Sequence, residues 1–181
     1  MPPPRIAAGT PVLFDASPLR RFSEADVLAE LMLFLKNAAI TDVVASEVDE
    51  AIRLGIRGTG PLRAMRAATA WPAVHVTPPE LFKEALVIQK SQGSTGRKDL
   101  GEITTVLVAQ HLGGLIVVAE DSLAKRLCRA RRLARVPTAL LAVDMHLSGS
   151  LSEDDAREVF RISTPPDVPS SDFRRYAAER E

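Results

Sequence analysis

Acidic residues follow two of the apolar runs that the sequence predicts to be buried strands. Asp15 comes directly after the short run Val12–Phe14, and Glu120 and Asp121 come directly after Leu115–Ala119. In open α/β sheets the carboxyl ends of the strands line the functional crevice, so carboxylates at these positions are well placed to bind a ligand. The chemistry that they would support is cation binding, because carboxylate oxygens are common ligands of hard cations.

Each of these positions also has a structural interpretation. Asp is a common turn residue, and Asp15 stands three residues ahead of Pro18. Asp121 is suited to be the N-cap of a helix that opens at Ser122. The case for chemistry therefore depends on whether further acids are placed to meet these two.

Glu47 lies on the face of its predicted helix that should turn inward. The helix is predicted from about Val43 to Leu54, and a wheel of 3.6 residues per turn places Glu47 within its apolar arc. The arc contains Val44, Val48, Ala51, Ile52 and Leu54, and the opposite side contains Asp49, Glu50 and Arg53. An inward carboxylate is costly unless it is paired or bound to metal, so Glu47 needs a partner. The alternatives are a side chain that reaches water from the edge of the arc, or a pairing with an arginine.

Asp99 and Glu102 stand at the start of another predicted helix, which runs to about Leu112. Their spacing of three puts both carboxylates on one face, near the positive end of the helix dipole. The same arrangement is an acceptable cap, with Asp99 as N-cap and Glu102 three residues later. Taken alone, this motif favours the structural interpretation.

Four of these acids taken together indicate a metal site. Carboxylates that gather in one crevice repel one another, which raises their pKa values unless a cation neutralises them. Oxygen ligands of this kind suit Mg²⁺ or Mn²⁺, which keep some of their waters and bind substrate phosphate. The four are Asp15, Glu47, Glu102 and Asp121.

The order and spacing of the motifs resemble the PIN-domain family of metal-dependent ribonucleases. The resemblance covers roughly residues 11–160 and is nearest to the toxin-like subgroup of that family. The segments that carry it are Val12-Leu-Phe-Asp-Ala-Ser-Pro-Leu19, Val43-Val-Ala-Ser-Glu-Val48, Asp99-Leu-Gly-Glu-Ile103 and Val117-Val-Ala-Glu-Asp-Ser-Leu-Ala-Lys-Arg126.

The resemblance implies a set of site residues. The acidic metal-binding and catalytic set would be Asp15, Glu47, Glu102 and Asp121. Glu120 matches a second acidic position found in part of the family, and the family's third acid can be read at either Asp99 or Glu102. Ser17 matches a position that often carries a small hydroxyl near the metal, which makes it a candidate substrate contact.

The activity implied by the resemblance is metal-dependent hydrolysis of RNA phosphodiester bonds by an endoribonuclease. Mg²⁺ or Mn²⁺ would polarise the phosphate and lower the pKa of the attacking water, so no Ser, Cys or His nucleophile is required. The toxin-like subgroup further implies the toxin of a toxin–antitoxin pair, with an antitoxin protein as partner. The alternative is a catalytically inactive PIN-like domain that serves as a protein-binding scaffold.

Arginines outside the acidic set are candidate RNA contacts. On the predicted helix Ser122–Ala134 they lie opposite the apolar face, where they could follow a phosphate backbone. The three that we assign to substrate binding are Arg126, Arg129 and Arg132. From charge alone, a solvated helix face is an equally good interpretation.

Predicted strands that alternate with helices indicate an α/β fold. We expect a three-layer sandwich with a central, mostly parallel sheet flanked by helices. The chain divides into an N-terminal arm (1–10), a PIN-like domain (11–163) and a flexible C-terminal tail rich in Pro, Ser and charge (164–181). A phosphate-binding loop is not expected, because the glycines and lysine of residues 93–98 have the wrong spacing for one.

Composition fits a cytoplasmic protein with one folded core. The formal net charge of the 181 residues is zero, which argues against binding nucleic acid by bulk charge alone. A single cysteine rules out an internal disulfide, and we find no targeting signal and no apolar run long enough to span a membrane. We also expect a homo-oligomer, with the helix Ala25–Asn37 as interface through Leu28, Leu31, Met32 and Leu35.

Overall fold

The structure is a computed structural model that describes residues 3–68, 72–95, 99–165, 169 and 172–180. In this part of the chain, strands alternate with helices along most of its length. The elements are β1 (Val12–Phe14), α1 (Ala16–Glu24), α2 (Leu28–Phe34), β2 (Ala38–Thr41), α3 (Asp42–Arg53), α4 (Gly60–Ala67), β3 (Ala73–His75), α5 (Pro79–Ser91), α6 (Leu100–His111), β4 (Ile116–Val118), α7 (Ser122–Ala130), β5 (Arg135–Val136), α8 (Thr138–Leu147), α9 (Glu153–Ser163) and α10 (Asp172–Arg180).

The five strands form one parallel sheet in the order β3-β2-β1-β4-β5. Val12 of β1 is in register with Ala38 of β2 on one side and with Ile116 of β4 on the other. Strands β2 and β3 therefore lie on one side of β1, and β4 and β5 lie on the other. In sheets of this kind, ligands bind outside the carboxyl ends of the strands at the point where the order reverses, which here lies between β1 and β4.

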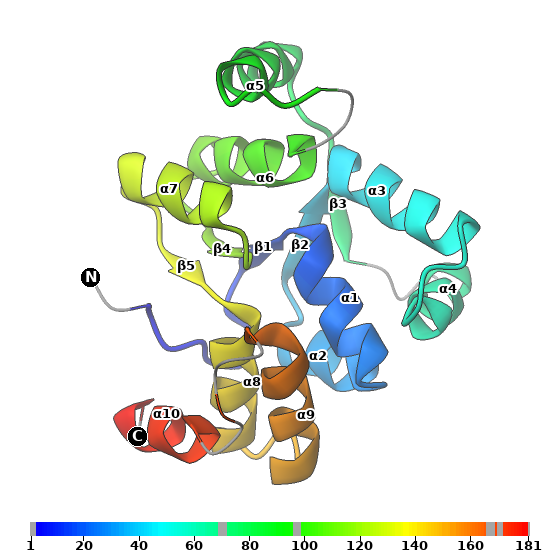
Figure 1. Ribbon diagram of the computed structural model, residues 1–181, viewed down its shortest axis with the longest axis vertical. Coiled ribbons are helices and arrows are strands. Elements are labelled where there is room, and N and C mark those ends of the chain that lie inside the picture. Colours follow the sequence, from blue (N-terminus) through cyan, green and yellow to red (C-terminus); the bar gives the residue numbers. More distant parts are fainter. Residues whose placement is uncertain (1–2, 69–71, 96–98, 166–168, 170–171, 181) are drawn as a thin grey trace.

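Helices cover both faces of the sheet, as the predicted three-layer architecture requires (Figure 1). Successive strand residues point to opposite faces, so Val12 and Phe14 pack under α1, α2, α8 and α9. Leu13 of the same strand packs with residues of α6 and α7 on the other face. Helix α5 lies outside α6 and packs through Ala85 against that helix.

Helix α1 is an element that we did not predict from the sequence. Its N-cap is Asp15, and Pro18 falls in its first turn, where a missing N–H costs little. Ser23 lies near the end of α1, and its hydroxyl donates to the carbonyl of Gly58.

The predicted helix Ala25–Asn37 is shorter in the structure, and its apolar face is not an interface. It runs only from Leu28 to Phe34 and is followed by strand β2. Its side chains at Leu28, Leu31 and Leu35 are 2%, 0% and 1% exposed, because they pack into the core against the sheet. The expectation that this face joins two copies of the chain was therefore wrong, and oligomerisation itself stays a prediction.

The predicted helix Ser122–Ala134 also ends early, at Ala130. Arg132 adopts a left-handed conformation with φ +57°, and the N–H of Leu133 donates to the carbonyl of Cys128 at 2.9 Å. This is the Schellman arrangement that closes helices, with an arginine at the position usually taken by glycine. Arg132 therefore lies in a turn and not on the helix that we expected it to share with Arg126 and Arg129.

Both ends of the described chain pack on α8. Helix α10 buries Phe173, whose ring meets that of Phe160 edge-on at 5.7 Å. The buried carboxylate of Asp144 accepts from Arg180 at 2.6 Å and from the N–H of Ile6 at 2.8 Å. Aromatic packing and this ion pair hold α10, which falls in the segment that we predicted from its composition to be a flexible tail.

The described residues contain no helix that is both long and apolar enough to cross a membrane.

Candidate metal centre

Asp15 stands at the bottom of the site, where β1 runs into α1. It is only 3% exposed, and it caps α1 by accepting from the backbone N–H of Ser17 at 3.5 Å. Burial raises the pKa of Asp15 to about 6, the backbone N–H groups of Ala16 and Ser17 oppose the shift, and the charges of Asp121 and Glu120 add to it. Asp15 is thus a carboxylate that folding holds in a position unfavourable to its charge.

Glu47 reaches the same place from α3, and the absence of a side chain at Gly101 makes room for it. Its Oε1 accepts from the backbone N–H of Gly101 at 3.1 Å, so Glu47 caps α6 from a different helix. A Cβ atom at residue 101 would lie 2.4 Å from Oε2 of Glu47, which is too close for any real contact. The side chain is partly buried and lines the pocket, as the helical wheel predicted.

Glu102 is the acid with the most unfavourable surroundings. Its Oε2 is buried and has no hydrogen-bond partner among the described residues. Burial raises the pKa of Glu102 to about 8, and repulsion from Asp15, Asp121, Asp99 and Glu47 adds to the shift. An orphaned, buried carboxylate oxygen surrounded by like charges is the type of ligand that a cation would satisfy.

Asp99 does not act as the side-chain cap that its spacing from Glu102 predicted. It takes a left-handed conformation with φ +66°, and its carboxylate accepts from the hydroxyl of Ser94 instead of from the first turn of α6. The cap is supplied by Glu47, as described above. Asp99 also lines the same pocket as Glu102.

Asp121 and Glu120 lie beside the pocket and not in its wall. Asp121 is exposed and caps α7, accepting from the N–H of Leu123 at 2.6 Å, which agrees with its structural interpretation. Its charge still acts on the centre, since it raises the pKa of both Asp15 and Glu102.

The carboxylate of Glu120 turns toward Arg21 of α1, whose Nε lies 3.9 Å from Oε2. Burial raises the pKa of Glu120, and the hydroxyls of Thr138 and Ser163 and the charge of Arg21 oppose the shift. Neither hydroxyl has hydrogen-bond geometry to Oε1 in the described part of the chain. Glu120 thus faces α1, α8 and α9 and does not line the pocket.

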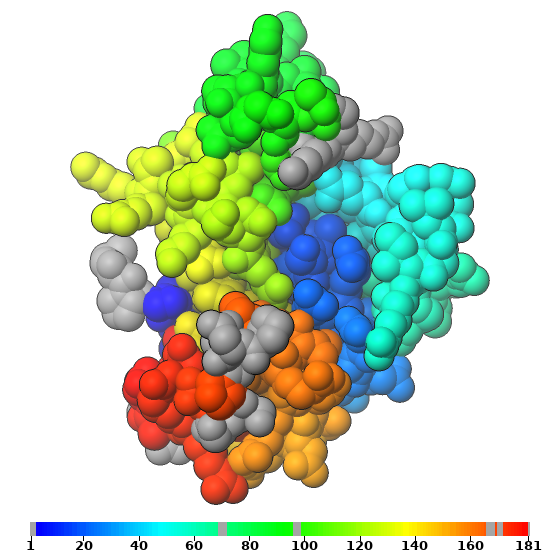
Figure 2. All heavy atoms as spheres, in the orientation of Figure 1, coloured from blue at the N-terminus to red at the C-terminus, as the bar shows by residue number. Residues whose placement is uncertain are grey.

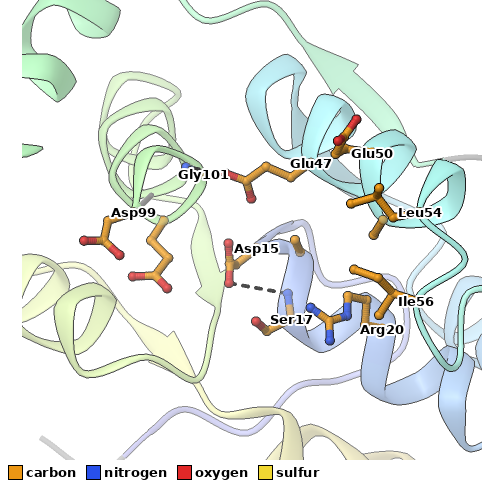
Figure 3. A pocket seen from close by; sticks show the side chains of 12 residues that line it. Asp15, Ser17, Arg20, Glu47, Glu50, Leu54, Ile56, Asp99 and Gly101 are labelled. Carbon is orange, nitrogen blue, oxygen red and sulfur yellow. Dashed lines mark hydrogen bonds between the residues drawn. The ribbon is translucent and has the colours of Figure 1, made fainter. Parts of the chain in front are cut away.

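The pocket itself opens at the carboxyl end of β1, between α1, α3 and the start of α6, and has a volume of about 210 Å³. In the space-filling view, the blue surface of α1 lies in a hollow between the cyan segment of α3 and the yellow-green segment of α7 (Figure 2). The residues that line it are Asp15, Ala16, Ser17, Arg20, Glu47, Glu50, Ala51, Leu54, Ile56, Asp99, Gly101 and Glu102. Figure 3 shows Asp15 and Glu47 pointing toward one another across its centre, with Ser17 below.

Five carboxylates line this pocket, but they do not form a closed metal cage. Among the described residues, no three His, Cys, Asp or Glu side chains are arranged to hold one ion. Mg²⁺ keeps several waters and usually takes only one or two carboxylates together with substrate phosphate. The donor set therefore fits an open, hydrated Mg²⁺ or Mn²⁺ site and does not fit a structural zinc site, which needs four close ligands.

The arginines assigned to RNA binding lie outside the pocket. Arg126 is exposed on α7 and donates to Gln92 at 2.7 Å, while Arg129 and Arg132 are exposed without lining the site. Their role in binding RNA stays a prediction.

The sequence did not identify the other residues that line the pocket, among them Arg20, Leu54 and Ile56. The signal for Arg20 was its spacing of three from Ser17, which puts both on one helix face, but it is visible only once α1 is recognised.

Comparison of the chain with models of known protein families finds no match, and neither does comparison with curated proteins.

Proposed function

We propose that the protein is a metal-dependent endoribonuclease that hydrolyses phosphodiester bonds of RNA in the acidic pocket. The observation that carries the proposal is Glu102, whose buried Oε2 lacks a partner while four other acids line the same pocket. Such a cluster is costly to hold together, and a divalent cation would remove that cost. The location of the pocket at the carboxyl end of the central strand β1 supports a ligand site in its own right.

The residues that would hold Mg²⁺ or Mn²⁺ are Asp15, Glu47, Glu102 and Asp121, with Asp99 beside them. Bound there, the metal supplies a polarised phosphate and a water of lowered pKa. The chain's own contribution is to hold the carboxylates: α1 and α7 fix the two Asp residues through their caps, and Gly101 fixes Glu47. Near neutral pH, Glu102 must release a proton before it can serve as a ligand, since its pKa is raised to about 8.

An inactive scaffold of the same fold is the second candidate, and one observation favours it. Asp15, Glu47 and Asp121 each cap a helix, so each has a structural reason to be where it is. Glu102 distinguishes the two functions, because its carboxylate caps no helix and its buried oxygen is unsatisfied. A scaffold would gain stability from an apolar residue at that position, whereas a metal site requires the acid.

The biological setting that we propose follows from the same assignment. As a toxin-like ribonuclease, the protein would act on cellular RNA in the cytoplasm and would be held in check by an antitoxin protein. The exposed Arg126, Arg129 and Arg132 are the surface that we propose for more distant parts of the RNA backbone.

Calorimetric titration with Mn²⁺ tests whether the pocket is a metal centre. We expect the unmodified protein to bind Mn²⁺ and to release protons on binding near neutral pH, because metal ligands must be deprotonated. Glu102→Gln should bind Mn²⁺ more weakly by at least about tenfold and release fewer protons. Glu153→Gln, which changes an exposed acid of α9, is the matched control. Unaltered Mn²⁺ binding by Glu102→Gln would contradict the assignment.

A further inference from the structure

Arg20 is the one basic residue among the described residues that line the acidic pocket. Although five carboxylates share that pocket, Arg20 forms no ion pair with any residue that the structure describes, and its buried Nε has no hydrogen-bond partner there. Figure 3 shows its side chain extending from α1 toward Ser17, below Asp15. An arginine held apart from its acidic neighbours is available to an anion from outside the protein.

Leu54 and Ile56 form an apolar part of the same wall, next to Arg20 (Figure 3). Their side chains are 58% and 38% exposed, unlike the core residues of α3. A Schellman turn fixes them: Gly55 has φ +64°, its N–H donates to Ile52 at 3.1 Å, and the N–H of Ile56 donates to Ala51 at 3.1 Å. The end of α3 therefore holds two large apolar side chains in solvent at the mouth of the pocket.

The two features together match the two chemical parts of a nucleotide. The guanidinium fork of arginine suits a phosphate, to which it can donate two parallel hydrogen bonds. Apolar side chains cover the face of a nucleobase that has left its stack. In a duplex that face is covered by neighbouring bases, so only an unstacked base reaches such a surface.

We infer that Arg20, Leu54 and Ile56 form a subsite for one unstacked nucleotide beside the acidic centre. Arg20 binds a backbone phosphate next to the scissile one, and Leu54 and Ile56 cover the base of that nucleotide. The substrate is consequently single-stranded, and the phosphate contact is independent of base sequence. The inference rests on the proposed nuclease function, which it deepens by naming the strandedness of the substrate and the residues that select it.

Binding of a short, fluorescently labelled oligouridylate tests the phosphate contact. Anisotropy would be measured with Mg²⁺ in the Glu102→Gln background, so that cleavage does not interfere. Adding Arg20→Gln should weaken binding by about 10- to 100-fold, the loss expected for a charge-assisted hydrogen bond. It should also reduce the slope of log affinity against log salt by about one. Arg20→Lys keeps the charge and should keep the slope while losing part of the affinity.

Arg21→Gln is the matched control for Arg20. Arg21 is the next residue of α1, but it pairs with Glu24 at 3.4 Å and with Glu120 at 3.9 Å within the protein. Its removal should leave oligonucleotide affinity and salt slope unchanged. An equal effect of Arg20→Gln and Arg21→Gln would mean that general charge, and not the subsite, attracts the strand.

The apolar wall is tested in the same assay. Changing Leu54 and Ile56 together to Ser should weaken binding of the single strand by about tenfold, the loss typical of one uncovered base. Leu33→Ser, which changes a 73% exposed leucine of α2 outside the pocket, should have no effect. The duplex of the same length should bind more weakly than the single strand and should not respond to the change at Leu54 and Ile56.

Equal affinity for single strand and duplex, or no binding of the oligouridylate at all, would overturn the subsite. The nuclease proposal fails separately. If cleavage is sensitive to chelator and its KM is unchanged by Arg20→Gln, the nuclease proposal is supported and the subsite is contradicted. If oligonucleotide binding depends on Arg20 but the protein shows no metal-dependent cleavage, the subsite is supported and the nuclease proposal is contradicted.

Discussion

The surroundings of Glu102 place an energetic cost on the folded protein that depends on pH. Its carboxyl lies half-buried among the charges of Asp15, Asp121, Asp99 and Glu47, and no described residue offers a hydrogen bond to Oε2. The proton is therefore held more tightly in the folded than in the unfolded chain. Stability contributed by that proton is fully present below pH 4.5 and is lost as pH rises toward about 8.

This linkage predicts the behaviour of Glu102→Gln in the absence of metal. The unmodified protein should melt at progressively lower temperature as pH rises through the interval between 4.5 and about 8, and Glu102→Gln should show a shallower decline. Asp15, with its pKa raised from 3.8 to about 6, leaves a remaining slope of the same sign in both proteins. Differential scanning fluorimetry over this pH range measures the difference. If the melting temperatures of the two proteins fall in parallel as pH rises, the Glu102 carboxyl does not bind the proton that stabilises the folded protein.

Gly101 is a second residue whose identity the site requires. In Gly101→Ala the added Cβ would have to displace the Glu47 carboxylate, which lies 2.4 Å from its position. We therefore expect Gly101→Ala to weaken Mn²⁺ binding measured by calorimetry, although alanine favours helices by up to about 1 kcal/mol.

The matched control for this change is Gly60→Ala at the start of α4, where a Cβ meets nothing within 4 Å. That variant should bind Mn²⁺ as the unmodified protein does. Mn²⁺ affinity that is identical in the Gly101→Ala and Gly60→Ala proteins would refute the role given to Glu47.

At the residue scale, the sequence predicted only part of the site. Strand-end position, helical periodicity and the family resemblance pointed to Asp15, Glu47 and Glu102, and the structure brings these three to one pocket. Leu54 was counted on the inward arc of its helix, yet it is 58% exposed because the helix ends at Arg53 and the turn carries Leu54 out of the arc. A helical wheel describes the interior of a helix and does not apply at its last residue.

At the scale of whole elements, predictions failed where a local signal was missing or ambiguous. Helix α7 closes at Arg132 in the left-handed conformation, and no glycine marks that point in the sequence. Strand β2, Ala-Ala-Ile-Thr, is only four residues long and follows a helical segment, so its apolar run is equally typical of a helix end. The segment forms a strand because it is buried on both faces of the sheet, and only the tertiary structure provides that burial.

Helix α10 supplies a prediction at this scale, because it packs on the core but does not line the pocket. Phe173 is 1% exposed and packs on α8 and α9 through Phe160 and His146. Phe173→Ala should lower the free energy of unfolding by about 3–5 kcal/mol in a urea titration.

Arg174→Ala, which changes the exposed neighbour of Phe173, is the control and should cost less than about 1 kcal/mol. Mn²⁺ affinity of the folded protein should be unchanged by both substitutions, because α10 does not line the pocket. A stability change below about 1 kcal/mol for Phe173→Ala would mean that the C-terminal segment behaves as the tail that composition predicted.

At the scale of the whole molecule, topology gathers the acids. Asp15 and Asp121 follow β1 and β4, which are neighbours in the sheet although 101 residues lie between the end of β1 at Phe14 and the start of β4 at Ile116. Helices α3 and α6 pack against each other across the same edge and bring Glu47 and Glu102 to it. The alternation of strands and helices predicted this architecture, and the order β3-β2-β1-β4-β5 explains why residues distant in the sequence share one pocket.

Cleavage of single-stranded RNA by the purified protein tests the central claim most directly. With Mg²⁺ or Mn²⁺ present, the unmodified protein should cut the RNA and excess chelator should stop it. Asp15→Asn keeps the size of the side chain and a good helix cap, so the fold should survive while the rate falls by orders of magnitude. Full cleavage by Asp15→Asn, or cleavage that persists in excess chelator, would contradict the metal-nuclease account.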